Sequence, residues 1–328
     1  MTGVALVTGL LLASGPPCEP RVRGVTPPPA EVFAVLGAPL LDGSAFPEGR
    51  VPMLPPTSPP EPLPIHAKDR AVPEGCLRNG CWAWAGWNDR RAMRGAGARL
   101  SIEAPEVSGR DHSLADVSLQ WGPDGQEIVE VGWEVSPGRY HDNAPHLFVQ
   151  RWVRGRPCEA GCSFFRWSGR LAPGMSLAPW IGKDLAVGWL LREGRAWAWA
   201  DGEWLGAFEL GEDAPVTANV AQWFGEVFSL EPTWQVPMGT GQHPDLADAA
   251  TIGSVCDVPE SGAGCVVRAT RFARVTRPDI YLMVRNGPGG FAYGGPVGPA
   301  GVTPRPPPSS ASEGTPPATG RSATSPPG

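Results

Sequence analysis

The stretch Ile128–Val135, with the sequence IVEVGWEV, indicates the fold class of this chain. Its valines, isoleucine and tryptophan are typical of a β-strand with one buried face. Side chains alternate between the two faces of a strand, so Glu130, Gly132 and Glu134 share one face. Glycine within a strand often marks the close approach of a ligand or of another backbone. The residues expected on the opposite, buried face are Val129, Val131, Trp133 and Val135.

A second strand-like stretch, Ala221–Phe228, carries another glutamate, Glu226, directly after a glycine. Phe224 and Phe228 flank it on the same face, and apolar neighbours favour a protonated carboxyl group. Two glutamates that meet across one cleft satisfy the needs of acid–base chemistry, with one carboxyl ionised and the other protonated. The alternative is that both glutamates lie on the solvated face of an antiparallel sheet.

Short strands and turn signals recur through the middle of the chain. Gly122–Gly125 is a turn that leads into the Glu130 strand, and Asp201-Gly202 between two tryptophan-bearing runs predicts a β-hairpin. No long segment shows the period of an α-helix. The sequence therefore predicts an all-β domain, either a β-sandwich or a barrel.

Composition divides the 328 residues into four parts. Residues 1–15 hold an apolar run that ends in small residues, which is typical of a signal peptide and too short for a membrane span. Residues 16–75 are rich in proline and form an extended leader, either a removable pro-segment or a linker. Residues 76–285 carry the expected strands. Residues 286–328 are rich in glycine, proline, serine and threonine and are expected to be disordered.

The seven cysteines form three sequence-close couples, with Cys18 left over. In a secreted protein this pattern predicts three local disulfides. The alternative pools two couples into a four-cysteine zinc site. The signal-like N-terminus favours the disulfides, and the couples are Cys76 and Cys81, Cys158 and Cys162, and Cys256 and Cys265.

Charge and motifs argue against several classes of function. The formal net charge of -6 leaves no basic footprint for nucleic acid. The glycine loop Met238–Pro244 lacks the lysine and the helix of a phosphate loop. The five histidines are scattered and no Gly-x-Ser-x-Gly occurs, which argues against a Ser-His-Asp hydrolase. No pattern indicates a cofactor.

Several short motifs occur in a fixed order over roughly residues 94–255. They are Glu130–Trp133, Val135–Pro137, Tyr140, Asp142-Asn143, Leu147-Phe148, the Cys158 and Cys162 couple, Gln222-Trp223, Gly225–Val227, Met238–Gly241 and Pro244. In order and approximate spacing this set resembles the neprosin family, the proline-cleaving glutamic peptidases first known from plants.

The resemblance implies a β-sandwich of two antiparallel sheets with two catalytic glutamates in its cleft. By position these are Glu130 and Glu226, whereas Glu134 has no clear counterpart and is interpreted as a supporting or surface residue. Family members are typically secreted with an N-terminal pro-segment, are acid-active, and favour cleavage after proline. The candidate substrate-binding residues are Trp133, Tyr140, Gln222, Trp223, Phe224 and Gly241.

The chain also departs from the family pattern. Phe224 stands where the family usually has glycine, on the same face as Glu226. This change puts cleavage after proline in doubt more than it does hydrolysis. His141 and the pair Gln242-His243 are further departures.

The leading hypothesis is therefore a secreted, acid-active glutamic endopeptidase without a metal or cofactor. Its substrate would be a polypeptide, including proline-rich ones, and it would act as a monomer away from the membrane. Two alternatives remain open. A glycoside hydrolase also uses two carboxylates and would turn over sugars, whereas a lectin-like module would bind its ligand regardless of Glu→Gln changes.

Overall fold

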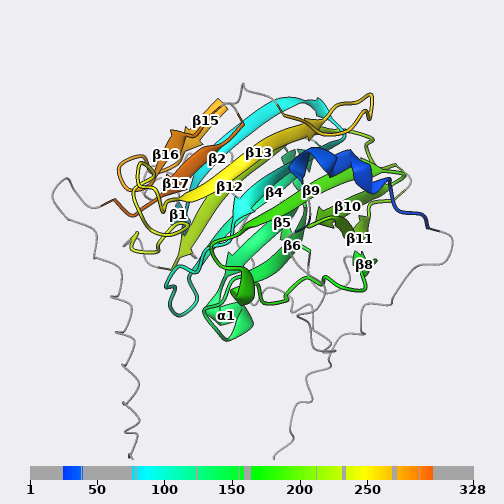
Figure 1. Cartoon of the computed structure of the whole chain (residues 1–328). Helices are drawn as coiled ribbons and strands as arrows, with labels where there is room; N and C mark the ends of the chain where they lie inside the picture. The colour runs from blue at the N-terminus through cyan, green and yellow to red at the C-terminus, as the bar shows by residue number, and fades with distance from the viewer. Residues whose placement is uncertain are drawn as a thin grey trace, which may run out of the picture.

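Two antiparallel β-sheets make up the described part of the chain in the computed structural model (Figure 1). This arrangement confirms the β-sandwich fold. The structure describes residues 25–37, 39, 76–77, 80–122, 125–154, 156–158, 164–211, 213–230, 234–267, 272–287 and 289–297. The signal-like residues 1–15 lie outside this part.

Eight of the described strands form one sheet, which we call the inner sheet. In spatial order they are β1 (Cys76–Leu77), β2 (Gly80–Met93), β12 (Ala218–Ser229), β4 (His112–Trp121), β5 (Glu127–Val135), β6 (His146–Val153) and β7 (Arg156–Pro157), with β15 (Phe272–Val275) paired to β2.

Nine of the described strands form the second sheet, the outer sheet. Their order is β16 (Leu282–Arg285), β17 (Phe291–Gly294), β13 (Ala250–Val258), β3 (Gly95–Ser101), β9 (Asp184–Arg192), β10 (Arg195–Ala200), β11 (Glu203–Glu209) and β8 (Phe164–Arg166), with β14 (Val266–Val267) paired to β13. The short helical elements are η1 (Ala30–Leu36), α1 (Pro137–Tyr140) and η3 (Ala178–Trp180).

The core lies between the two sheets. The alternation predicted for β5 is confirmed, since Val129, Val131, Trp133 and Val135 are fully buried in it. Buried indole N–H groups need acceptors, and three of them cross from one sheet to a backbone carbonyl of the other. The pairs are Trp133 to Ser101 at 2.7 Å, Trp223 to Gly97 at 3.0 Å and Trp189 to Val117 at 3.1 Å.

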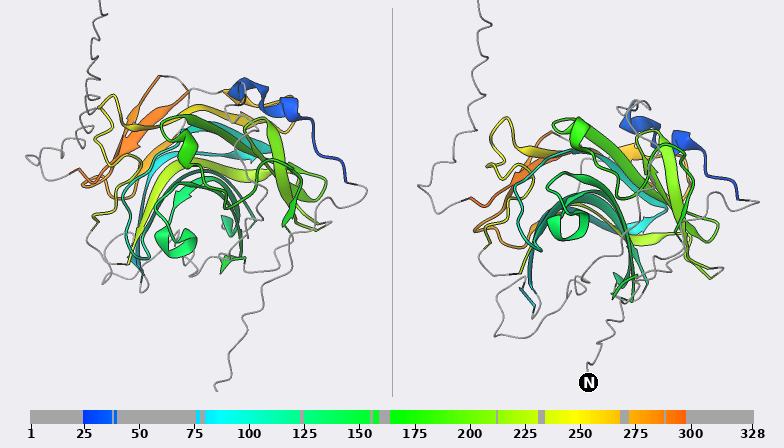
Figure 2. Two further views of the ribbon diagram at one scale, coloured as in Figure 1. Left: turned by 60° about the horizontal axis from the view of Figure 1, so that its bottom comes forward. Right: turned by 90° about the horizontal axis from the view of Figure 1, so that it is seen from below.

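The inner sheet is strongly curved, with the outer sheet over its convex side and α1 beneath its arch (Figure 2). Glycines on the concave face allow this curvature. A Cβ atom at Gly132 would lie 1.9 Å from the carbonyl oxygen of Ala115, and one at Gly86 would lie 2.2 Å from that of Trp223. The close approach expected at Gly132 is therefore real, and the approaching group is the backbone of β4.

The hairpin predicted at Asp201-Gly202 is also confirmed. It joins β10 to β11, and both residues have positive φ angles, 45° and 92°. Two positive φ angles in a two-residue loop match the twist of a hairpin, and glycine adopts this conformation without a steric cost.

Part of the leader is ordered and packs on the outer sheet, where the sequence predicts an extended segment. Phe33 of η1 is fully buried, and its ring lies over Gly188, where a Cβ atom would come within 2.7 Å of it. Trp204 donates its indole N–H to the carbonyl of Pro28 at 2.7 Å. The apolar run around Phe33 is ordered because it covers a tryptophan-rich outer face that β10 and β11 would otherwise expose.

The boundary predicted at residue 286 is wrong, because β17 follows it inside the outer sheet between β16 and β13. Tyr293 is fully buried and packs on the convex side of the inner sheet, where a Cβ atom at Gly225 would lie 2.1 Å from its ring. The glycines here serve close packing, since a Cβ atom at Gly294 would lie 2.0 Å from the carbonyl oxygen of Gln242.

Two of the predicted disulfides, Cys76–Cys81 and Cys256–Cys265, are present. Cys158 is disulfide-bonded, and because Cys162 lies outside the described residues its pairing stays a prediction. None of the helices in the described ranges is long and apolar enough to cross a membrane.

Candidate active site

The register of three neighbouring strands brings the two candidate glutamates onto the concave face of the inner sheet. β4 lies between β5 and β12, and Glu130 pairs with Ser118 of β4 while Glu226 pairs with Leu114 of the same strand. On β4, β5 and β12 the residues that face the core alternate with these paired residues. Glu130 and Glu226 therefore lie on the face of the inner sheet that turns away from the outer sheet.

Glu130 is partly buried and is held from one side. The indole N–H of Trp152 on β6 donates to its Oε2 atom at 2.7 Å. Burial, followed by the negative charge of Glu226, raises the pKa of Glu130 to about 8, and the bond from Trp152 works in the opposite direction. Desolvation therefore dominates, and Glu130 is a carboxylic acid over the acidic range.

Glu226 is 8% exposed and lies beside a histidine. The Nε2 atom of His112 is 3.6 Å from its Oε1 atom, and the His112 ring stacks on Phe228 with centroids 5.2 Å apart. The contact places an imidazole nitrogen directly beside the carboxyl group of Glu226.

Glu134 is buried, so the alternative of a surface position is wrong for this residue. Arg139 and Tyr140 of α1 both donate to its Oε2 atom, at 3.0 Å and 3.1 Å. His112 lies 3.9 Å from its other oxygen. Tyr140 stacks on His146 with centroids 4.1 Å apart, and burial together with the charge of Glu134 raises the pKa of its hydroxyl well above 10.

A third acidic residue, Asp116, lies between the two glutamates and is absent from the candidates that the sequence suggests. It pairs with Phe224 of β12 on one side and with Gly132 of β5 on the other. It is 1% exposed, and neither carboxylate oxygen has a hydrogen-bond partner among the described residues. The alternation of side chains along β4 could have identified Asp116 from the sequence. Val117 and Leu119 face the core, so Asp116 must face the same side as the glutamates.

Apolar side chains form the rest of this face. Trp84, Leu114, Phe148 and Phe224 make one buried cluster that is separate from the main core. Phe224, a candidate from sequence, is thus part of the floor, two residues from Glu226 on the same strand and opposite Asp116 of β4. Gln222 lies on the same face and accepts a hydrogen bond from Gln120. Tyr140 reaches this face from α1.

Two substrate-binding candidates are wrong, since Trp133 and Trp223 are fully buried between the sheets. Both have the same strand parity as the core valines, which is the physical reason. Gly241 is packed away from the concave face, because its nearest neighbours are Pro237 and Gly295, neither of which belongs to that face.

The protonation of Glu130 predicts how stability depends on pH. Its folded-state pKa of about 8 exceeds the ordinary value of 4.5, so the native state holds this proton more tightly than the unfolded state does. The stabilisation is complete below about pH 4.5 and is lost as the pH rises through about 8, by at most about 1.4 kcal/mol per pH unit.

We therefore expect Glu130→Gln to flatten the dependence of the unfolding free energy on pH between about 5 and 8. Denaturant unfolding with the disulfides intact measures this quantity. Near pH 8 the variant should be more stable than the wild type. Parallel curves for the two proteins would show that Glu130 titrates normally.

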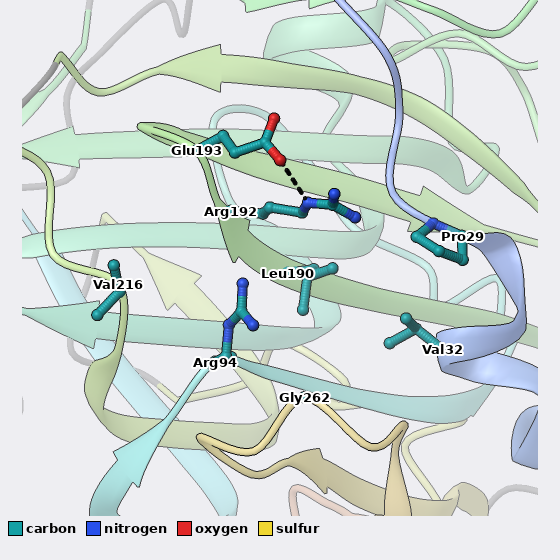
Figure 3. A pocket seen from close by; sticks show the side chains of 8 residues that line it. All are labelled: Pro29, Val32, Arg94, Leu190, Arg192, Glu193, Val216 and Gly262. Atoms are coloured by element: carbon teal, nitrogen blue, oxygen red, sulfur yellow. Dashed lines mark hydrogen bonds and ion pairs between the residues drawn. The ribbon is translucent and has the colours of Figure 1, made fainter.

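A hollow of about 540 Å³ lies elsewhere, between the leader and the outer sheet (Figure 3). Its one carboxylate, Glu193, is paired with the adjacent Arg192 at 2.9 Å. The hollow therefore offers no acid–base pair, and the concave face remains the candidate active site. The lining residues are Pro29, Val32, Arg94, Leu190, Arg192, Glu193, Val216 and Gly262.

Solved structures with a similar arrangement include two peptidases and a galectin. Scytalido-glutamic peptidase with a peptide-based transition state analog is 10% identical, with 66% of this chain and 98% of that chain covered and a TM-score of 0.41. SCP-B, a member of the eqolisin family of peptidases in complex with the tripeptide Ala-Ile-His, is 9% identical with the same coverage and a TM-score of 0.39. Sheep galectin-11 is 9% identical, with 44% and 93% covered and a TM-score of 0.26. These values are too low to transfer the role of any residue.

The model of the neprosin family matches residues 109–296, which is more than half of the chain. The match spans β4, β5 and β12, the strands that carry the acidic residues of the concave face. This match and the β-sandwich define the class of protein, a peptidase. The chain belongs to the neprosin family.

Proposed function

We propose that this protein is a secreted, acid-active glutamic endopeptidase in which Glu226 is the general base and Glu130 the general acid. The observation that carries this proposal is the contrast between the two carboxyl environments on one concave face. Glu130 is desolvated with a raised pKa of about 8, whereas Glu226 faces His112 at 3.6 Å. Two carboxyl groups in unlike environments are the arrangement that acid–base catalysis uses.

In the proposed reaction, Glu226 takes a proton from a water molecule whose oxygen attacks the scissile carbonyl carbon. Glu130 donates its proton to the carbonyl oxygen, which becomes a hydroxyl group of the tetrahedral intermediate. As the C–N bond breaks, the leaving nitrogen takes up the proton that Glu226 gained, and the hydroxyl proton returns to Glu130. Water is consumed, and both glutamates regain their starting forms.

The floor of the site supports an apolar stretch of polypeptide as substrate. Trp84 and Phe224 lie beside Glu226, and their ring centroids are 6.1 Å apart. Apolar and aromatic surfaces favour side chains such as the ring of proline. Because Phe224 occupies space that a smaller residue would leave open, we propose that proline is accepted but not required.

The proposed cellular setting is extracellular. The disulfides Cys76–Cys81 and Cys256–Cys265 support an oxidising compartment. We propose a monomer that acts on proline-containing polypeptides.

The experiment that tests this function is cleavage of an unstructured, proline-containing protein across the acidic and neutral pH range, with the cut sites mapped by mass spectrometry. We expect cleavage at acidic pH that declines before about pH 8, where Glu130 loses its proton. The double variant Glu130→Gln/Glu226→Gln should be inactive. Glu127→Gln is the matched control, because it makes the same change on β5 at a residue that contacts Arg151 at 3.8 Å, and it should remain active.

The rival functions give different results. Turnover of oligosaccharides that the double variant abolishes would replace the peptidase with a glycoside hydrolase. Binding of a sugar or peptide without turnover, unchanged in the double variant, would indicate a lectin-like module. Cleavage of protein that survives both substitutions would show that other residues are catalytic.

A further inference from the structure

We propose that Asp116 is a positioning residue of this site, a third carboxyl group that is protonated in the native protein and shares a proton with Glu130. This inference extends the proposed function, because the shared proton would keep Glu130 in its acid form over a wider pH range.

The position of Asp116 is the first argument. On β4 it lies midway between Ser118, the partner of Glu130, and Leu114, the partner of Glu226. Its side chain therefore projects from the central strand on the line between the two glutamates. The absence of a side chain at Gly132, opposite Asp116, leaves the path towards Glu130 open on that side.

The second argument is the cost of a charge at this position. Asp116 is 1% exposed, and no ion pair or hydrogen bond among the described residues compensates its oxygens. A buried carboxylate without a partner is so unfavourable that the group takes up a proton instead. Burial, followed by the charges of Glu130 and Glu226, raises the pKa of Asp116 well above its usual range.

The third argument is that the surrounding charges do not reverse this preference. Among the described residues of this face, His112 lies between Glu134 and Glu226, and Arg139 is paired with Glu134. Carboxyl groups therefore dominate the surroundings of Asp116. Glu226 from β12 and Glu130 from β5 are the charges that act on Asp116. The other titratable groups of this face surround Glu134 of β5 and are His112 from β4 itself, His146 from β6, and Arg139 and Tyr140 from α1. Tyr293 of β17 lies on the opposite, convex side of the sheet.

Two carboxyl groups that share protons titrate as a pair. The first proton leaves the pair at one pH. The second proton is retained to a higher pH, because its loss would leave two negatively charged carboxylates next to each other. The proton that remains is available to Glu130. An asparagine at position 116 cannot supply such a proton, so Glu130 would then lose its own proton in a single step at lower pH.

The first test is independent of catalysis and uses the full chain. The slope of unfolding free energy against pH counts the protons that the native state binds beyond the unfolded state. We expect Asp116→Asn to lower this count by close to one proton between about pH 5 and pH 8. Ser118→Ala is the matched control, since Ser118 is equally buried on the same strand and face and its hydroxyl is likewise unpartnered, and it should leave the count unchanged.

Infrared spectra of the wild type over the same pH range provide a second measurement that needs no variant. They should show more than one protonated carboxyl group that persists to near-neutral pH. A single such group, or an unchanged proton count in Asp116→Asn, would overturn the proposal.

The third measurement is the pH profile of cleavage. We expect the alkaline limb of activity to move to lower pH in Asp116→Asn by roughly one unit, with the activity at the acidic plateau retained within a few-fold. A purely structural role would lower the plateau and leave the limb in place. If the proton count changes but the wild type cleaves no protein, the carboxyl pair stands and the peptidase proposal fails.

Discussion

Glu226→Gln is expected to lower kcat by about 10²–10⁴-fold, the usual contribution of a general base, and to be more damaging than Glu130→Gln. The amide of glutamine has no free carboxylate to accept a proton from water. At position 130 the same substitution removes a proton donor, but the amide N–H still donates a hydrogen bond to the carbonyl oxygen, which retains part of the stabilisation of the developing charge.

Steady-state kinetics at acidic pH with a peptide substrate separates the two roles. KM should change less than kcat in both variants, because neither substitution alters the apolar floor formed by Trp84, Leu114, Phe148 and Phe224. Glu127→Gln on the same strand serves as the control for the substitution itself. A greater loss in Glu130→Gln than in Glu226→Gln would reverse the assignment of acid and base.

Phe33→Ala is expected to lower the free energy of unfolding by about 3–5 kcal/mol, the usual cost of removing a buried phenylalanine. Phe33 is fully buried, with its ring centroid 5.1 Å from that of Trp199 and 6.0 Å from that of Trp204. It fills the space above Gly97 and Gly188, whose missing side chains make the groove. The η1 segment therefore forms part of a buried cluster with the outer sheet.

Val35→Ala is the matched control, because Val35 lies on the same helix η1 but is 47% exposed. Its replacement should change stability by no more than about 0.5 kcal/mol. Denaturant unfolding followed by tryptophan fluorescence measures both variants, since Trp199 and Trp204 report on the docking of the segment. Equal effects of the two substitutions would mean that the leader does not stabilise the domain.

The position of the leader also refines the expectation of a removable pro-segment. The backbone N–H of Cys265 donates to the carbonyl of Val32 at 2.8 Å, and Trp204 donates to that of Pro28 at 2.7 Å. Both contacts are on the outer sheet, whereas the candidate active site lies on the concave face of the inner sheet. Residues 25–37 therefore stabilise the sandwich without covering the glutamates.

Alternation along single strands was enough to predict most of the local structure. The period of two separates Val131 from Glu130, and it places Trp133 and Trp223 in the core despite their appeal as groove residues. The hairpin at Asp201-Gly202 followed from the same local rules. Composition was less reliable as a guide to disorder, because glycine-rich sequence also occurs where strands pack closely. The strand β17 was missed for this reason.

The sequence by itself determined the fold class and the family and proposed the two candidate glutamates, since strand periodicity, turn chemistry and the order of the motifs are local properties. The tertiary structure alone decided that β4 lies between β5 and β12, which inserts Asp116 between Glu130 and Glu226. It also decided the unequal environments of the glutamates, because Trp152 and His112 reach them from other strands. Strand order and desolvation depend on contacts between residues that are distant in the chain, and no pattern within a single strand carries that information.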